Sequence, residues 1–181
     1  MGLTMVEITK EKIREYAKKY DARFRGTDDE KVYDEMVEWF KHNRFLDRER
    51  FLNILNWKLA VKLPFKKAKE QNKDEHIRQI TEIAFSSKIQ EERIKLLLSF
   101  VGVGYPVASA ILHFAFTDKY PILDFRVIWS LRWEQPKYYT FDFWQKYCDR
   151  IQSISKETGE SIRTVDKALW EYSKEHQPKK K

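Results

Sequence analysis

Cysteine, glycine and proline are scarce in this sequence of 181 residues. Cys148 is the one cysteine, so the chain cannot form an internal disulfide, an all-cysteine zinc site or an iron–sulfur cluster with four cysteine ligands. Five glycines and five prolines provide few turns, whereas 35% of the residues are charged. This balance favours long helices connected by short loops over a sheet of many strands.

Long apolar runs are also missing. No stretch approaches the roughly 18 apolar residues that a membrane-spanning helix needs, and the start M-G-L-T-M-V-E-I-T-K lacks the apolar core of a signal peptide. We therefore expect an intracellular protein without a membrane partner. Six Trp, nine Tyr and twelve Phe are enough for one domain with a substantial core, or for two small lobes that share a cleft.

Acidic residues are outnumbered by basic ones, and the formal charge is +7. A basic balance is compatible with a nucleic acid or another anionic partner, although many proteins without one are equally basic. From residue 50 to residue 69 there are six basic residues and no acid. This run is either a solvated helix face or a surface that contacts phosphates.

The spacing of apolar residues predicts an all-α fold with no strand and no internal repeat. The predicted helices are 9–20, 28–42, one that begins after Asp47 and ends near Pro64, one through Ile77 and Ile83, 88–100, 107–115, 125–133, 143–154 and 162–172. Predicted caps are Thr9, Asp47, Ser161 and, at a C-terminus, Gly159. We expect the last two helices to form an αα-hairpin rather than a DNA-reading helix-turn-helix. Residues 1–176 are predicted to be one domain, and 177–181 a basic flexible tail.

The most distinctive local pattern lies between two helical segments, where Gly102 and Gly104 are one residue apart. Such glycines allow a tight turn whose amides point outward at the start of a helix, which is the chemistry of a phosphate site. Pro106 falls in the first turn of the second helix, where its missing N–H costs nothing. Asp124 follows after a short loop, so its carboxylate could act on whatever the turn positions.

The segment F-V-G-V-G at 100–104 resembles the helix-hairpin-helix of DNA-repair glycosylases, in which the usual form is hydrophobic-Pro-Gly-Val-Gly. Here Val101 replaces the proline. The segment Y-P-I-L-D-F-R-V at 120–127 resembles the Pro-hydrophobic-Asp-x-x-Val signature of the same superfamily, with one extra hydrophobic residue before Asp124. Two motifs in this order make residues 88–132 similar to the helix-hairpin-helix-GPD superfamily, which includes endonuclease III-like DNA glycosylases; the hairpin motif itself is 88–116.

This resemblance implies a two-lobed helical fold like that of DNA glycosylases, with double-stranded DNA bound between the lobes and the protein acting as a monomer. The backbone of one DNA strand would be held by the amides of Gly102, Val103, Gly104 and Tyr105. A monovalent cation would bind the hairpin carbonyls of residues 99–104, and no other metal or cofactor is implied. A target nucleotide would be flipped into a pocket near Asp124.

Asp124 has two compatible interpretations. Cleavage of an N-glycosidic bond builds positive charge on the sugar, which a carboxylate stabilises, and the same group can orient a water. Alternatively, Asp124 only caps the helix that follows it. Superfamily members that also cleave the DNA backbone use a lysine two residues beyond the second hairpin glycine, where this chain has Pro106. The resemblance therefore implies a monofunctional glycosylase with water as the nucleophile.

Other site residues are less specified by the sequence. Possible DNA contacts are Lys58, Lys62, Arg126 and Arg132, although either arginine could instead pair with an acid such as Glu134. Aromatic residues that could stack on a base are Trp57, Trp129, Trp133 and Tyr138, although core packing is the commoner role of such residues. His113 is expected to be structural. Two further functions stay open: a non-catalytic module that binds DNA or RNA, and a protein-interaction domain.

Overall fold

The computed structural model describes residues 8–59 and 62–178, and all regular structure within them is helical. The helices are α1 (Lys10–Phe24), α2 (Asp28–His42), α3 (Arg48–Lys58), α4 (Lys62–Gln71), α5 (Asp74–Ser86), α6 (Gln90–Leu98), α7 (Tyr105–Ala115), α8 (Phe125–Ser130), α9 (Phe141–Thr158) and α10 (Ile162–His176). The prediction of an all-α fold is confirmed. Among these helices, none combines the length and the apolar character needed to cross a membrane.

The predicted caps are all present. Thr9, Asp47 and Ser161 each accept a hydrogen bond from a backbone N–H three residues further along the chain, at the start of α1, α3 and α10. Gly159 ends α9 in the left-handed conformation, with φ 69°. Because a cap depends on contacts within one turn, the local sequence was enough to place it.

Most helix boundaries differ from the prediction by a few residues, and the differences with a clear backbone cause concern α3, α4 and α8. α3 ends at Lys58 because Leu59 is extended (φ −90°, ψ 117°), and a separate helix, α4, covers most of the basic run. Pro64 lies in the first turn of α4, where proline is tolerated, rather than after the end of α3. α8 ends at Ser130, three residues early, because Arg132 adopts φ 61°.

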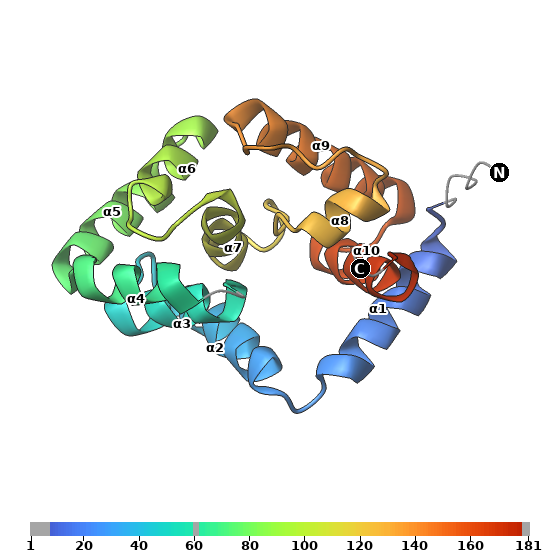
Figure 1. Cartoon of the computed structure of the whole chain (residues 1–181), viewed down its shortest axis with the longest axis horizontal. Coiled ribbons are helices and arrows are strands. Elements are labelled where there is room, and N and C mark those ends of the chain that lie inside the picture. Colours follow the sequence, from blue (N-terminus) through green and yellow to red (C-terminus); the bar gives the residue numbers. More distant parts are fainter. Residues whose placement is uncertain (1–7, 60–61, 179–181) are drawn as a thin grey trace.

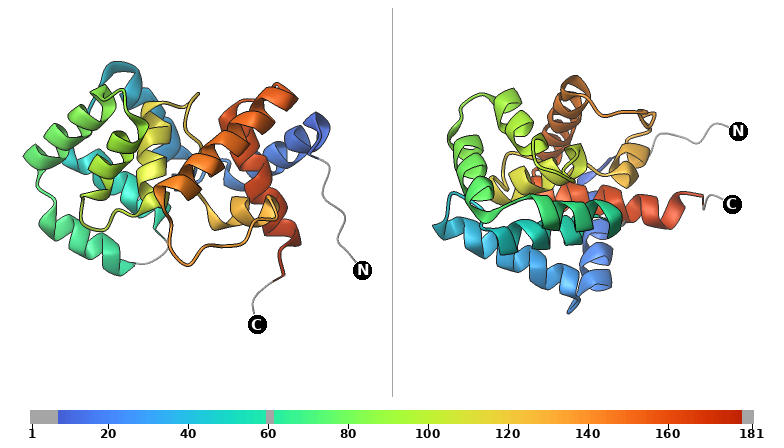
Figure 2. Two further views of the ribbon diagram at one scale, coloured as in Figure 1. Left: turned by 90° about the horizontal axis from the view of Figure 1, so that it is seen from above. Right: turned by 60° about the vertical axis from the view of Figure 1, so that its left-hand side comes forward.

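The helices pack as two groups, which form the two predicted lobes (Figure 1). α2 to α7 form one lobe, and α1 joins α8, α9 and α10 in the other. The most extensive pairing in the molecule is between α1 and α10, which lie against each other in the views of Figure 2. The chain therefore starts in the second lobe, builds the first lobe, and returns.

α7 is the central helix of the first lobe (Figure 1). Every residue from Val107 to Phe114 is buried, so the helix is enclosed on all sides. From its end, residues 116–124 carry the chain back to the second lobe. Asp124 is thus at the junction of the lobes, at the first turn of α8.

Candidate functional site

Asp124 is both a helix cap and one half of an ion pair. Its Oδ1 accepts a hydrogen bond of 2.9 Å from the backbone N–H of Arg126, which confirms the predicted capping role. Its Oδ2 lies 2.7 Å from Nζ of Lys58. The two side chains keep 17% and 10% of their surface exposed, respectively. The carboxylate is therefore held in place by two donors and still reaches solvent.

Lys58 is the last residue of α3, so this ion pair joins the two lobes. Its place in the basic run predicted a contact with a DNA phosphate, whereas the structure pairs it with Asp124. The two residues are 66 positions apart in the sequence, and nothing in the local pattern of either one indicates the other.

The backbone leading to Asp124 is fixed by three side chains from other elements. Ile122 N–H donates to Asp166 Oδ2 at 2.8 Å, and Leu123 N–H donates to Ser109 Oγ at 2.8 Å. The Tyr147 hydroxyl donates to the carbonyl of Ile122 at 2.8 Å. With buried amides and carbonyls satisfied in this way, the segment holds one conformation and presents Asp124 in a defined direction.

His113 supports the same segment from α7. Its Nδ1 lies 2.7 Å from the carbonyl of Tyr120, and its Nε2 lies 2.9 Å from the hydroxyl of Tyr33. Complete burial lowers the pKa of His113 to about 3. The ring is therefore neutral at physiological pH: Nδ1–H donates to Tyr120, and Nε2 accepts from Tyr33. This agrees with the structural role expected for His113.

The Asp124–Lys58 pair borders a cavity of about 380 Å³ between helices of both lobes. Its aromatic lining residues are Tyr20, Phe24, Trp57, Phe125 and Trp170. Four further charged residues line it, namely Asp29, Arg126, Arg163 and Asp166. The volume is in the range of small-molecule pockets, and a flat ring could lie between the aromatic walls. Within the described residues no group of three or more potential ligands is arranged to hold a metal ion.

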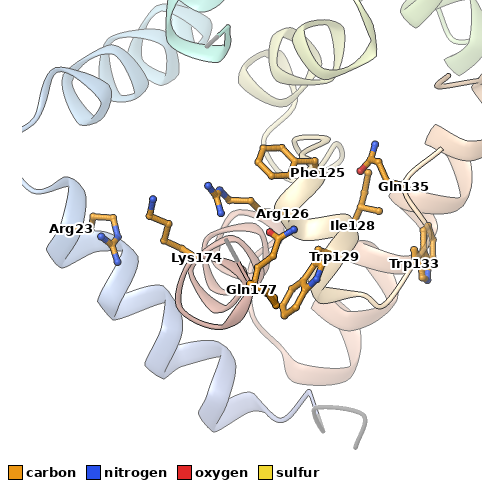
Figure 3. Close-up of a pocket in the computed structure, with 10 residues that line it drawn as sticks. Arg23, Phe125, Arg126, Ile128, Trp129, Trp133, Gln135, Lys174 and Gln177 are labelled. Atoms are coloured by element: carbon orange, nitrogen blue, oxygen red, sulfur yellow. The ribbon is translucent and has the colours of Figure 1, made fainter. Parts of the chain in front are cut away.

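The four aromatic residues proposed for a base pocket are in different places. Trp57 lines the cavity beside Asp124, and its Nε1–H donates to the carbonyl of Asp29 at 3.2 Å. Trp129 and Trp133 instead line a separate hollow of about 940 Å³ on the outer side of α8 (Figure 3). Tyr138 is 74% exposed and lines neither space. Closeness to Asp124 in the sequence therefore did not indicate closeness in space.

The hollow in Figure 3 is basic, with Arg23, Arg126 and Lys174 in its lining and no acidic residue. Arg126 also lines the cavity of Asp124. Its guanidinium lies 5.2 Å from the ring centre of Trp170, and that of Arg132 lies 4.7 Å from the ring centre of Trp129. In the part of the chain that the structure describes, neither Arg126 nor Arg132 forms an ion pair.

The turn between α6 and α7 has the backbone that its two glycines predict. Gly102 adopts φ 83°, which favours glycine, and Gly104 caps α7 without a side-chain hydrogen bond. The N–H of Val103 donates to the carbonyl of Phe100 at 3.2 Å, so it is not available to a phosphate. The amides of Gly102, Gly104 and Tyr105 have no acceptor among the described residues. Three of the four predicted backbone donors therefore stay free.

Asn72 holds this turn and was not identified from the sequence. Its Oδ1 accepts from the N–H of Val101 at 3.1 Å, and its Nδ2 donates to the carbonyl of Val101 at 2.9 Å. Asn72 is buried. A proline at position 101 could not donate the first of these bonds, so this turn requires a residue with a backbone N–H, such as Val101.

Two further predictions concern the hairpin carbonyls and Lys62. Of the hairpin carbonyls expected to bind a monovalent cation, those of Phe100 and Val101 each accept an internal hydrogen bond. A carbonyl oxygen has two lone pairs, so the cation stays a prediction. The side chain of Lys62 lies outside the described part of the structure, although its backbone begins α4.

Comparison with solved structures finds similarity to a crystal structure of Methanocaldococcus jannaschii 8-oxoguanine glycosylase/lyase in complex with 15mer DNA containing 8-oxoguanine. The two chains have 16% sequence identity and a TM-score of 0.49, and the similarity covers 94% of this chain and 93% of that chain. No family model and no curated protein matches the sequence. The function proposed below therefore depends on the residues of this chain.

Proposed function

We propose that this protein binds double-stranded DNA and hydrolyses the N-glycosidic bond of a damaged or modified base, with Asp124 as the key carboxylate. The observation that carries the proposal is the position of Asp124. It is a partly exposed carboxylate, held by two donors, on the wall of a cavity with five aromatic residues. A carboxylate that only capped α8 would not need such a cavity beside it.

The chemistry follows from this geometry. As the bond from the base to C1′ breaks, the base leaves with both electrons and takes up a proton, and positive charge develops on the sugar. The carboxylate of Asp124 stabilises that charge and orients a water. The water adds its oxygen to C1′ and gives up a proton, so one water is consumed overall. Pro106 cannot act as a nucleophile, which supports a monofunctional reaction.

The cavity supports binding of a flipped nucleotide, because a base inside a duplex cannot reach a carboxylate in a protein pocket. Trp57 from α3 and Tyr20, Phe24 and Trp170 from α1 and α10 offer faces for a planar ring. Stacking of a base on an aromatic side chain contributes about 1–3 kcal/mol. The lining comes from both lobes, so the pocket depends on their relative position.

The DNA backbone would be held on either side of this cavity. The free amides of Gly102, Gly104 and Tyr105 are at the first turn of α7, where the helix dipole favours an anion. Arg126 and Arg132 form no ion pair among the described residues; Arg126 provides positive charge in the cavity of Asp124, and Arg132 provides it beside Trp129. Such contacts position DNA without reading its sequence, and they predict an affinity that falls steeply with salt.

The ion pair also favours a second candidate function, a combined glycosylase and lyase that uses Lys58. After passing a proton to Asp124 at 2.7 Å, the neutral amine could attack C1′ as the base leaves with the bonding electrons. Loss of a second amine proton and opening of the sugar ring would give an imine to Lys58. Removal of a C2′ proton would then eliminate the 3′-phosphate.

A panel of duplexes, each with a different damaged base, tests these functions. Hydrolysis predicts base release by the wild type that is lost in Asp124→Asn and kept in the control Asp118→Asn, an exposed aspartate outside the cavity. Borohydride reduction during the reaction would trap a covalent protein–DNA complex, lost in Lys58→Met, if the lyase function holds. Trapping that survives Lys58→Met would exclude that residue as the nucleophile.

The remaining outcomes identify the other functions. Salt-sensitive DNA binding that is unchanged in Asp124→Asn, with no base released from any duplex, would favour a non-catalytic binding module. Absence of salt-sensitive DNA binding would contradict both glycosylase candidates and would favour a protein-interaction domain.

A further inference from the structure

Two charged side chains of α10 line the cavity without pairing with each other. Asp166 and Arg163 are three residues apart, so they lie on the same face of the helix. An aspartate and an arginine in this relation often form an ion pair, but none joins them here. Each side chain has its own partners instead, and in each side chain one polar atom has no hydrogen-bond partner.

The carboxylate of Asp166 is 3% exposed. Its Oδ2 accepts the N–H of Ile122 at 2.8 Å, while its Oδ1 is buried and has no hydrogen-bond partner. Burial raises the pKa of Asp166 to about 7, because the ionised carboxylate loses its hydration there. The bond to Ile122 is one of the three side-chain bonds that hold the segment leading to Asp124, so Asp166 supports the site through one oxygen while the other has no partner.

Arg163 shows the complementary arrangement. Its Nη2 lies 3.3 Å from the Tyr20 hydroxyl, and its guanidinium lies 4.4 Å from the ring centre of Tyr33. Its Nε is buried and has no partner. Both residues line the cavity, and each has one buried polar atom without a partner, an acceptor on Asp166 and a donor on Arg163. Unsatisfied buried polar atoms are costly and rare, and a pair of opposite type matches a ligand that carries a donor beside an acceptor.

We propose that Asp166 and Arg163 bind the edge of an oxo nucleobase, in which a ring N–H lies next to a carbonyl. This inference rests on the proposed function, and it adds the class of base. A guanidinium binds a base carbonyl such as O6 of guanine well, and a carboxylate accepts from base N–H groups. Bases of the hypoxanthine, guanine and uracil type carry both groups side by side. Adenine has no carbonyl, so it would leave Arg163 with a weaker partner.

Aromatic residues of the cavity would contact the ring of the same base. Trp57 and Trp170 line the same cavity from α3 and α10, so a ring whose edge faces Asp166 and Arg163 would lie among aromatic side chains. Asp124 and Lys58 are on the same wall as the segment that Asp166 holds. The edge of the base and its bond to the sugar would therefore be recognised by different groups: Asp166 and Arg163 for the edge, Asp124 for the sugar.

Asp166→Asn is a sharp test because Ile122 N–H requires an acceptor. The asparagine must turn its carbonyl oxygen toward Ile122, so its NH2 group replaces the Oδ1 acceptor. A donor would then face the ring N–H of the base. Equilibrium binding would be measured with otherwise identical duplexes that carry hypoxanthine, uracil, adenine or an abasic tetrahydrofuran. The nucleotides with bases would be 2′-fluorinated so that their N-glycosidic bond resists cleavage.

We expect the wild type to bind the hypoxanthine and uracil duplexes about tenfold or more tightly than the adenine duplex, since one well-placed base contact discriminates by that factor. Asp166→Asn should lose this preference while its affinity for the tetrahydrofuran duplex stays within about twofold, as in the control Asp118→Asn. Preserved preference in a folded Asp166→Asn protein would overturn the inference, as would equal binding of adenine by the wild type.

A second binding measurement uses only the wild type, so its result does not depend on whether Asp166→Asn folds. Methylation of hypoxanthine at N1 replaces the ring N–H that Asp166 would accept, so 1-methylhypoxanthine should lose the preference. Equal binding of the two bases would overturn the inference. If the wild type releases bases and binds tetrahydrofuran duplexes but shows no oxo preference, the base class fails and the proposed function stands. If it binds no damaged or abasic duplex above undamaged DNA, both fail.

Discussion

Replacing Lys58 with methionine should destabilise the protein, and the loss measures how much the ion pair that joins the lobes contributes to the free energy of unfolding. At 2.7 Å the attraction between the two charges is roughly 6 kcal/mol with an effective dielectric constant of about 20. Most of this is offset by the desolvation of two groups that keep only 10% and 17% of their side-chain surface exposed. Loss of one partner of a fully buried pair costs about 3–5 kcal/mol, and loss of an exposed partner about 0–1 kcal/mol.

The Lys58–Asp124 pair lies between these limits, so we expect Lys58→Met to lower the free energy of unfolding by about 2 kcal/mol. The variant leaves Asp124 with one donor, the N–H of Arg126. Urea unfolding followed by circular dichroism gives this value, and for a chain of this size it corresponds to a fall in Tm of about 4–8 °C. Lys88→Met, which removes an exposed lysine, is the matched control and should change stability by less than about 0.5 kcal/mol.

A double-mutant cycle with Asp124→Asn separates the pair from other effects of each substitution. A coupling energy of about 1–2 kcal/mol between the two substitutions would support a pair that stabilises the junction of the lobes. Additive effects, within about 0.3 kcal/mol, would refute the reasoning, because they would mean that the two groups do not interact in solution.

Three further predictions concern residues that support the site. Asp166→Asn should gain stability relative to the wild type as pH rises from about 4 to 7, by at most about 4 kcal/mol. The raised pKa of Asp166 favours the folded wild type at low pH, and that advantage is lost as the carboxyl ionises. Urea unfolding at several pH values measures this change. A difference in the free energy of unfolding between the two proteins that does not change with pH would contradict it. Asn72→Ala should lower the free energy of unfolding by about 2 kcal/mol and weaken DNA binding, because Val101 loses both bonds that hold the turn; unchanged stability would contradict this role. Gly102→Ala should lower the free energy of unfolding by about 1 kcal/mol because Gly102 has a positive φ. Gly104→Ala should change the free energy of unfolding by less than about 0.5 kcal/mol, since its Cβ would meet Pro106 Cδ at an ordinary 3.8 Å, but it should lower DNA affinity. Equal losses of stability in the two variants would contradict this distinction.

The sequence by itself determined the helical fold, the caps and the turn. Thr9 and Asp47 could be identified as caps because a side chain at an N-cap bonds to an amide only three residues away. Gly102 could be placed in the turn because a positive φ strongly favours glycine. Asp124 could be identified as a cap for the same local reason, whereas the catalytic role that we propose for it depends on residues that are distant in the sequence.

Only the tertiary structure decided which residues surround Asp124. Lys58 comes to it because α3 of one lobe faces α8 of the other, a contact across 66 residues that neither local pattern encodes. The same packing brings Trp57, Arg163 and Asp166 to the cavity and places Trp129 on the far side of α8. Side-chain direction on a helix depends on how the helix is docked, so the residues of a site between two lobes are defined only when the lobes are assembled.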